Sequence, residues 1–175
     1  GFLGVDMFFV ISGYGITSSL LSRGAESGLR HFLGSFYSRR IRRLCPALFV
    51  YLMLVSLFLV LFKLEPGSEL DTGIFSVFGF SNIYLYLSKS NYFAESSALN
   101  PFTQTWSLGV EEQFYLLFPF LVWFSGVLSG TRKSLARFRG IVAVISLTSL
   151  VLFIAFAFID TSAAYYLVPM RFWEI

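Results

Sequence analysis

Long apolar segments are the feature that most constrains this chain. Four of them approach or reach the ~18–20 apolar residues that cross a bilayer: Val5–Leu21, Leu44–Phe62, Leu108–Leu128 and Gly140–Ile159. Only 13% of the residues are charged, against about 25% in a soluble domain. Backbone polar groups inside a bilayer must pair within their own segment, which favours helices. The sequence therefore predicts an all-α polytopic transmembrane helix bundle, a single domain over residues 1–175, with about four to six membrane segments.

The distribution of arginines predicts how the chain threads the membrane. Loop 22–43 contains six arginines and one glutamate, and such loops remain cytoplasmic. A fifth apolar segment, Gly73–Leu87, is short and partly polar. If it spans, the basic loop 131–139 falls outside. If 73–105 is a re-entrant or interfacial excursion, loop 131–139 falls on the cytoplasmic side. The short, polar character favours the excursion, which needs a covering protein cavity.

The residue inventory excludes some chemistry. Cys45 is the single cysteine, which excludes an intrachain disulfide and a multi-cysteine metal site. His31 is the single histidine and leaves few ligands for zinc. We expect no metal, a surface position for His31 and a packed position for Cys45. The net charge of +3 is small and scattered, so no nucleic-acid partner is expected.

Two adjacent acids, Glu111 and Glu112, open the third apolar segment. An acid at bilayer depth costs ~2.5–3.5 kcal/mol, so it usually faces a cavity or a partner. Helical spacing aligns Ser107, Glu111 and Tyr115 on one face, while Glu112 lies ~100° away. Alternatively, both acids lie ~7 Å from the helix start, near the headgroups, where water and the helix dipole stabilise them. The spacing leaves both readings open.

The first apolar segment has an acid and several small residues. Asp6 lies near its start, where an interfacial acid is stabilised by the helix dipole. Ser12, Gly13 and Gly15 form a small-residue face suited to close helix packing. Packing is a sufficient explanation for this face.

An arginine cluster precedes the second apolar segment in FYSRRIRRLCPAL (36–48). At helical spacing Arg40 and Arg43 share a face, as do Arg39 and Arg43. Paired guanidiniums can bind phosphates bidentately, or the cluster can simply anchor a cytoplasmic helix end. Pro46 is expected in the first turn of the helix that follows.

Four motifs together resemble one family. They are GFLGVDMFFVISGYGIT (1–17), RRIRRLCPAL (39–48), TWSLGVEEQFYLLFP (105–119) and VPMRFWEI (168–175). Their sequences, order and spacing resemble the integral membrane acyltransferases of the acyltransferase-3 type, which O-acetylate surface polysaccharides. In this comparison Glu111 falls on the family's recurring acid and Glu112 on a freer position.

The resemblance implies an enzyme that moves an acyl group, usually acetyl, from cytoplasmic acyl-CoA (acetyl-CoA) to a hydroxyl of a cell-surface carbohydrate or lipid-linked glycan. It implies no bound cofactor and a place in a lipid bilayer, typically the bacterial plasma (inner) membrane. The family has more helices than this chain shows, so we expect a partial domain that lacks the first and the C-terminal helices. The family's catalytic histidine would precede Gly1, so this piece by itself is expected to be inactive.

The resemblance also implies residue roles. Glu111 or Asp6 would orient the catalytic histidine, and three arginines would bind the phosphates of acyl-CoA: Arg39, Arg40 and Arg43. The remaining motif residues would belong to a polar core: Ser12, Trp106, Ser107, Tyr115, Arg171 and Glu174.

Two other classes of function fit part of the pattern. A transporter or flippase subunit for a glycan or acyl carrier would use the same arginines and buried acid as a polar pathway, without chemistry. A structural bundle that scaffolds a complex would explain the hydrophobicity but not four ordered motifs.

Overall fold

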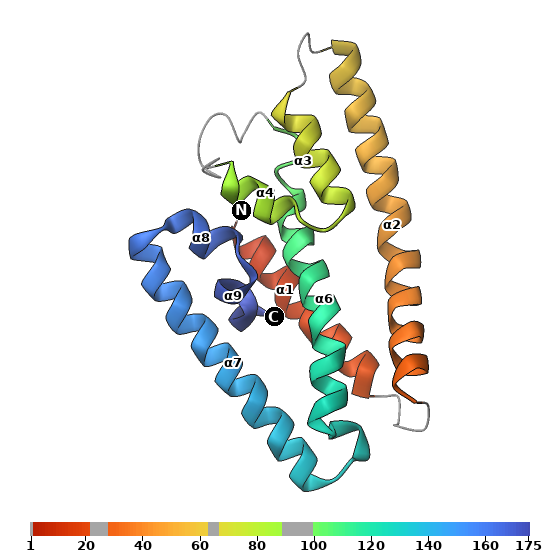
Figure 1. The fold of residues 1–175 in the computed structure, drawn as a ribbon, viewed down its shortest axis with the longest axis vertical. Coiled ribbons are helices and arrows are strands. Elements are labelled where there is room, and N and C mark those ends of the chain that lie inside the picture. Colours follow the sequence, from red (N-terminus) through yellow and green to blue (C-terminus); the bar gives the residue numbers. More distant parts are fainter. Residues whose placement is uncertain (1, 22–27, 63–66, 89–99) are drawn as a thin grey trace.

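The computed structural model describes residues 2–21, 28–62, 67–88 and 100–175, and these residues form helices and turns without any strand. The predicted all-α class is confirmed. The elements in chain order are α1 (Phe2–Leu21), α2 (Leu29–Phe62), α3 (Ser68–Val77), α4 (Ser81–Leu87), α6 (Thr105–Ser125), η1 (Val127–Ser129), α7 (Arg132–Ile159), α8 (Thr161–Tyr166), α9 (Val168–Arg171) and η2 (Phe172–Glu174). Figure 1 shows their arrangement.

Three of the described helices, α1, α2 and α7, are long and apolar enough to cross a membrane. Most of their side chains remain uncovered by the rest of the described chain, as surfaces that face lipid do. Helix α6 is also long, with 21 residues, but eleven of them are buried. It lies between α2 and α7 (Figure 1), so the third predicted segment is a helix that the protein covers more fully than it covers α1, α2 or α7.

The predicted bounds of this segment, 108–128, need correction. Helix α6 begins three residues earlier and ends at Ser125. Gly126 caps it with a positive φ of 73°, a conformation that glycine adopts without steric cost and that commonly ends helices.

Two expectations for the arginine segment are wrong. Residues 29–43 are not a loop, because α2 is a continuous helix of 34 residues from Leu29 to Phe62. Pro46 lies inside this helix rather than in its first turn. The segment's leucine and arginine residues favour helix, and the arginine side chains can extend from the helix into water. Proline removes the bond to the Arg42 carbonyl, a loss that membrane helices tolerate.

The segment Gly73–Leu87 does not form a single spanning helix. It is divided between α3 and α4, of ten and seven residues, by a turn in which Gly79 has a φ of 71°. Both are shorter than the ~20 residues that a span requires. The described part therefore favours the excursion, while residues 89–99 of the predicted 73–105 excursion lie outside the described residues.

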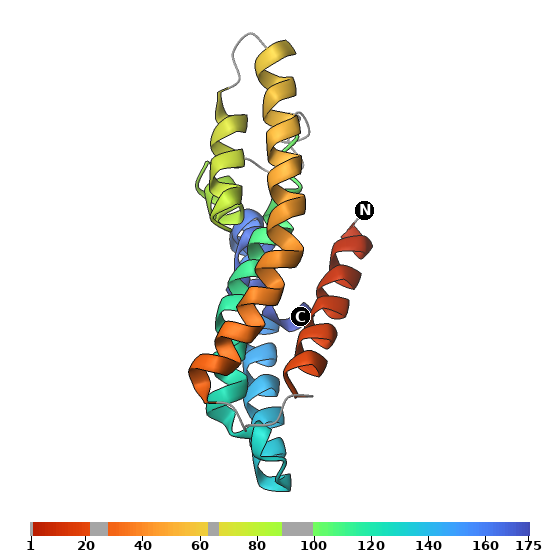
Figure 2. The ribbon, with the colours of Figure 1, turned by 90° about the vertical axis from the view of Figure 1, so that its right-hand side faces the viewer.

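This arrangement places the two basic segments at one end of the molecule. The C-terminal end of α1, the start of α2 and the turn from α6 to α7 all lie toward the lower end in Figures 1 and 2. The arginine-rich start of α2 and the basic segment 131–139 thus share an end, as the charge rule requires of cytoplasmic segments. We call it the basic end; its cytoplasmic location stays a prediction.

Buried amide side chains fix the start of α6 against α4 and α8. The Asn82 amide donates to the Tyr166 carbonyl at 2.9 Å, and the Gln113 amide donates to the Gly79 carbonyl at 2.9 Å and to Asn82 Oδ1 at 2.8 Å. A Cβ on Gly109 would lie 2.9 Å from Asn82 Oδ1, so glycine permits this approach. Satisfied buried networks of this kind specify one packing arrangement. The first turns of α6 are therefore enclosed by protein.

The small residues of α1 have two different uses. The Ile175 carbonyl leaves no room for a Cβ on Gly13, so close packing occurs there, but against the backbone that follows η2 and not against a helix as predicted. At Gly15 no described atom would lie within 4 Å of a Cβ. Gly15 instead faces a cavity.

Candidate functional site

Glu111 lies in the second turn of α6 and is 1% exposed. One turn later Tyr115 donates its hydroxyl to Glu111 Oε1. Glu111 Oε2 is buried and has no hydrogen-bond partner among the described residues. The alternative in which this acid lies in water near the headgroups is wrong, because α4 and α8 pack around the start of α6. A buried acceptor without a partner costs about 1–3 kcal/mol, so the position favours a ligand or a further side chain.

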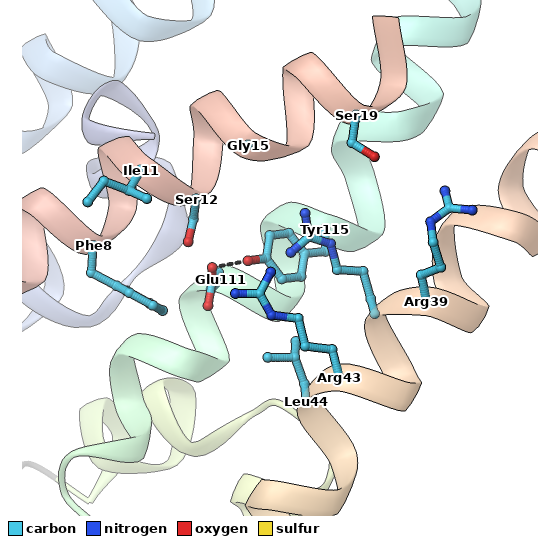
Figure 3. A pocket seen from close by; sticks show the side chains of 11 residues that line it. Phe8, Ile11, Ser12, Gly15, Ser19, Arg39, Arg43, Leu44, Glu111 and Tyr115 are labelled. Carbon is cyan, nitrogen blue, oxygen red and sulfur yellow. Dashed lines mark hydrogen bonds between the residues drawn. The ribbon is translucent and has the colours of Figure 1, made fainter. Parts of the chain in front are cut away.

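Glu111 faces a cavity of about 510 Å³ between α1, α2 and α6. Figure 3 shows Ser12 of α1 pointing toward the Glu111 carboxyl and Arg43 of α2 reaching toward it, with Arg39 farther out on α2. We call this space the arginine cavity. The residues that line it are Phe8, Ile11, Ser12, Gly15, Ser19, Arg39, Arg40, Arg43, Leu44, Glu111 and Tyr115.

The predicted arginines all line this cavity. Arg40 is half-buried, whereas Arg39 and Arg43 are exposed. The Arg40 guanidinium carbon lies 4.6 Å from the Tyr115 ring centroid and 5.6 Å from that of Phe36. Such cation–π contacts contribute about 0.5–2 kcal/mol each. They orient the guanidinium without consuming its N–H donors.

The charges in the arginine cavity do not balance internally. Three arginines and one carboxylate line it. Within the described part of the chain, no ion pair joins Arg40 or Arg43 to a carboxylate. The guanidiniums of Arg40 and Arg43 can therefore attract an anion, and their planar fork matches phosphate oxygens.

Tyr115 contacts both the buried acid and a neighbouring arginine of the arginine cavity. Its hydroxyl contacts Glu111, and the face of its ring contacts Arg40. Tyr115 is 5% exposed, and a 2.9 Å hydrogen bond from Tyr37 to the Leu116 carbonyl joins α2 to α6 nearby. The orientation of the acid is therefore coupled to that of the neighbouring arginine.

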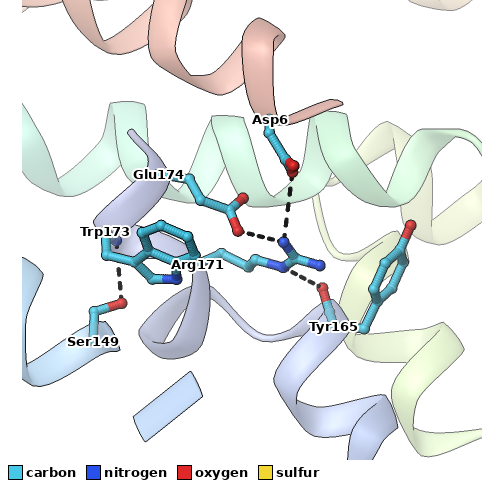
Figure 4. Close-up of polar contacts among 6 residues, drawn as sticks. All are labelled: Asp6, Ser149, Tyr165, Arg171, Trp173 and Glu174. Carbon is cyan, nitrogen blue, oxygen red and sulfur yellow. Dashed lines mark hydrogen bonds and ion pairs between the residues drawn. The ribbon is translucent and has the colours of Figure 1, made fainter. Parts of the chain in front are cut away.

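A second polar cluster surrounds Arg171. Its guanidinium contacts the Glu174 carboxylate, lies 3.8 Å from Asp6 Oδ1, and donates through Nε to the Tyr165 carbonyl at 3.1 Å (Figure 4). The guanidinium carbon also lies 4.8 to 5.8 Å from three ring centroids, those of Trp106, Phe153 and Tyr165. This arginine is therefore paired with carboxylates and packed against rings of the protein itself.

This cluster borders a separate cavity of about 350 Å³. We call it the Trp173 cavity. The residues that line it are Asp6, Phe153, Ala157, Thr161, Ala164, Tyr165, Arg171, Trp173 and Glu174. Asp6 therefore lies in a different cavity from Glu111.

The structure separates the predicted site residues into two groups. Ser12, Tyr115, Glu111 and the three arginines come together, whereas Asp6, Trp106, Arg171 and Glu174 form the second cluster. Ser107 lines neither cavity and donates its hydroxyl to the Gln104 carbonyl at 3.3 Å. Glu112 is half-buried, and its carboxylate lies against Gly79 rather than in the arginine cavity.

The remaining candidates lie outside the arginine cavity. His31 is exposed near the start of α2, and Cys45 is half-buried. Among the residues that the structure describes, no group of three or more His, Cys, Asp or Glu side chains could hold a metal ion.

The sequence reasoning missed Asn82 and Gln113, which fix the start of α6, and Phe36, which contacts Arg40. Gln113 lies inside the TWSLGVEEQFY motif, which was the available signal. Asn82 is one amide in a short helix, and only its burial at 0% exposure reveals its role.

Comparison with known proteins identifies the family of this chain. A family described as an acyltransferase domain matches residues 1–173, so the chain belongs to this acyltransferase family. It is 37% identical over 173 residues to the O-acetyltransferase OatA of Staphylococcus aureus strain NCTC 8325 / PS 47, and equally to OatA of strain COL. These alignments cover 95% of this chain and 27% of each relative. The chain thus spans about a quarter of the length of these curated relatives. No solved structure matches it.

Proposed function

We propose that the full-length protein is a membrane O-acyltransferase that moves an acyl group, most simply acetyl, from acyl-CoA to a hydroxyl of a cell-surface carbohydrate or lipid-linked glycan. Family membership and the names of the relatives support O-acetyl transfer. The observation that carries the proposal is the arginine cavity, where three arginines face one deeply buried acid.

The charge of the cavity fits the donor. Coenzyme A is a polyanion, and its phosphates complement the guanidiniums of Arg40 and Arg43, which form no ion pair with a carboxylate among the described residues. Arg40 is oriented by Tyr115 and Phe36, which reduces the side-chain entropy lost on binding. The arginines lie at the basic end, where a cytoplasmic donor would arrive.

The buried acid fits the reaction. In acyl transfer the acceptor oxygen attacks the thioester carbonyl carbon, the C–S bond breaks, and the hydroxyl proton must reach the departing thiolate. The family places its general base on a histidine that precedes the Gly1–Thr17 motif. Glu111 Oε2 would accept a hydrogen bond from that imidazole and stabilise its charged form, as acids do in catalytic triads. Asp6 is the weaker candidate for this role because it contacts Arg171.

The test uses the full-length protein in membranes with acetyl-CoA labelled on the acetyl group. Label that enters envelope glycan, with one free thiol released per transfer, would support the enzyme. The transporter alternative predicts neither label in glycan nor release of coenzyme A. Retention of both signals in Glu111→Gln would exclude Glu111 from the mechanism, and their absence from the unaltered protein would overturn the proposal.

A further inference from the structure

The Trp173 cavity has the opposite electrostatic character to the arginine cavity. Asp6 and Glu174 provide two carboxylates against the single guanidinium of Arg171. The lining is therefore net negative and disfavours an anion such as coenzyme A. A ligand that enters here must be neutral or cationic.

One buried carboxylate oxygen defines what that ligand must offer. Glu174 is 7% exposed, and its Oε2 is buried without a hydrogen-bond partner among the described residues. Asp6, by contrast, has a side chain that is 45% exposed and accessible from the cavity. A carboxylate only accepts hydrogen bonds, so the ligand must bring donors. Hydroxyl groups meet this requirement without adding charge.

Besides hydrogen-bond acceptors, a sugar site needs an apolar surface, and aromatic rings provide one here. Trp173 is 38% exposed and lines the cavity with Tyr165 and Phe153. Its backbone N–H donates to Ser149 Oγ at 3.2 Å (Figure 4). Its ring centroid lies 5.7 Å from that of Phe153. The indole is therefore held in position from α7. A flat apolar ring beside carboxylates complements the C–H face and the hydroxyl edge of a pyranose.

The two cavities also lie apart along α1. Asp6 precedes Ser12 by six residues, about 9 Å along the helix axis, and Ser12 faces Glu111 in the arginine cavity. The C-terminal end of α1 lies at the basic end of the molecule (Figure 1). The Trp173 cavity is therefore displaced away from the end at which the arginines lie.

We infer that the Trp173 cavity is the binding site for a neutral carbohydrate acceptor, with Glu174 and Asp6 accepting hydrogen bonds from its hydroxyls and Trp173 stacking on its ring. That the bound sugar is the acceptor of the acyl group rests on the proposed function. Sugar binding itself can be measured without catalysis. Arg171 would hold both carboxylates in place rather than contact the reacting atoms.

The experiment measures binding to the full-length protein in nanodiscs, by isothermal titration without any acyl donor. The probes are a panel of neutral oligosaccharides built from glucose, galactose and N-acetylglucosamine, and coenzyme A is titrated separately. We expect at least one oligosaccharide to bind, and Glu174→Gln and Trp173→Leu each to weaken it at least tenfold. Coenzyme A affinity should change less than twofold in both variants.

Matched controls separate the site from general damage. Glu111→Gln changes an equally buried acid in the other cavity and should leave oligosaccharide affinity within twofold. Asp71→Asn, at an exposed acid on α3, should leave both affinities unchanged. Trp173→Leu lies outside the ion cluster, so it remains informative if Glu174→Gln fails to fold.

Each outcome decides a separate question. If no oligosaccharide in the panel binds, or if binding survives both substitutions, the acceptor site is wrong. If oligosaccharide binds as expected but no acetyl group is ever transferred, the carbohydrate site stands and the proposed acyltransferase fails. If coenzyme A competes with oligosaccharide, the two cavities are not separate sites and the inference falls.

Discussion

The two cavities beside α1 use arginine in opposite ways. Around Arg171, two carboxylates, a carbonyl and three aromatic rings contact the guanidinium. Around Arg40 the protein provides aromatic faces, and among the described residues no carboxylate forms an ion pair with it. The first arginine is satisfied by the fold, while the second is oriented and left with its donors available.

This difference indicates how an arginine that stabilises the fold can be distinguished from an arginine that binds a ligand. Both types of arginine come from short motifs, RRIRRLCPAL and VPMRFWEI, and neither motif shows by itself whether its arginine is paired with a carboxylate. The distinguishing property is whether carboxylates within the fold neutralise the guanidinium. An internally paired arginine should affect stability when it is changed, and an unpaired one should affect ligand binding.

The largest expected effect is on stability, from Arg171→Ala. Removal of this guanidinium leaves Asp6 and Glu174 without a counter-charge, which costs about 3–5 kcal/mol for a buried pair. Arg43→Ala, at an exposed arginine of the other cavity, should change stability by less than about 0.5 kcal/mol. Thermal unfolding in nanodiscs, followed by tryptophan fluorescence, measures both. Equal unfolding midpoints for the two variants would contradict the distinction between an internally paired arginine and an unpaired one.

The second-largest expected effect is the loss of acetyl transfer in Glu111→Gln. The amide keeps the shape of the side chain and still accepts the Tyr115 hydroxyl, but it cannot stabilise a charged base. We expect the rate of acetyl transfer to fall about 100-fold or more, with the amount of inserted protein unchanged. Asp71→Asn is the matched control on α3 and should retain the full rate. Near-normal turnover in Glu111→Gln would reduce this acid to a structural role.

A smaller effect is expected when Arg40 and Arg43 are both changed to alanine. Loss of two charge-assisted contacts to phosphate should weaken coenzyme A binding about 10- to 100-fold, measured by titration, with oligosaccharide affinity unchanged. The control is the pair Arg137→Ala with Arg139→Ala, which removes two exposed arginines of α7 outside both cavities. If the Arg40→Ala, Arg43→Ala variant keeps its affinity for coenzyme A, these two arginines serve only membrane topology.

The smallest effect distinguishes the two contacts of Tyr115. Tyr115→Phe removes the hydrogen bond to Glu111 and keeps the ring beneath Arg40, so transfer should fall about three- to tenfold, in line with ~1 kcal/mol for one hydrogen bond. Tyr115→Leu also removes the cation–π contact, and coenzyme A affinity should fall in addition. Initial rates and titrations on both variants give the comparison. Identical behaviour of the two would show that the ring does not orient Arg40.

Much of this site was predictable from motif spacing. The i, i+4 relation of Glu111 and Tyr115 and the shared face of the arginines are local properties of helices, and both are confirmed. The choice between Glu111 and Asp6 as the acid that orients the catalytic histidine could not be made from local sequence. The partner of Asp6 is Arg171, 165 positions later in the sequence, and only packing brings them together.

The sequence by itself determined the helical class, the membrane character and the family, because apolar length, charge and motif identity are properties of contiguous residues. Only the tertiary structure decided that α2 continues through its proline, that 67–88 divides into two short helices, and that the polar motif residues form two cavities of opposite charge. Those features depend on contacts between residues distant in sequence. Burial and charge pairing are set by neighbours in space, and no local pattern encodes which neighbours those will be.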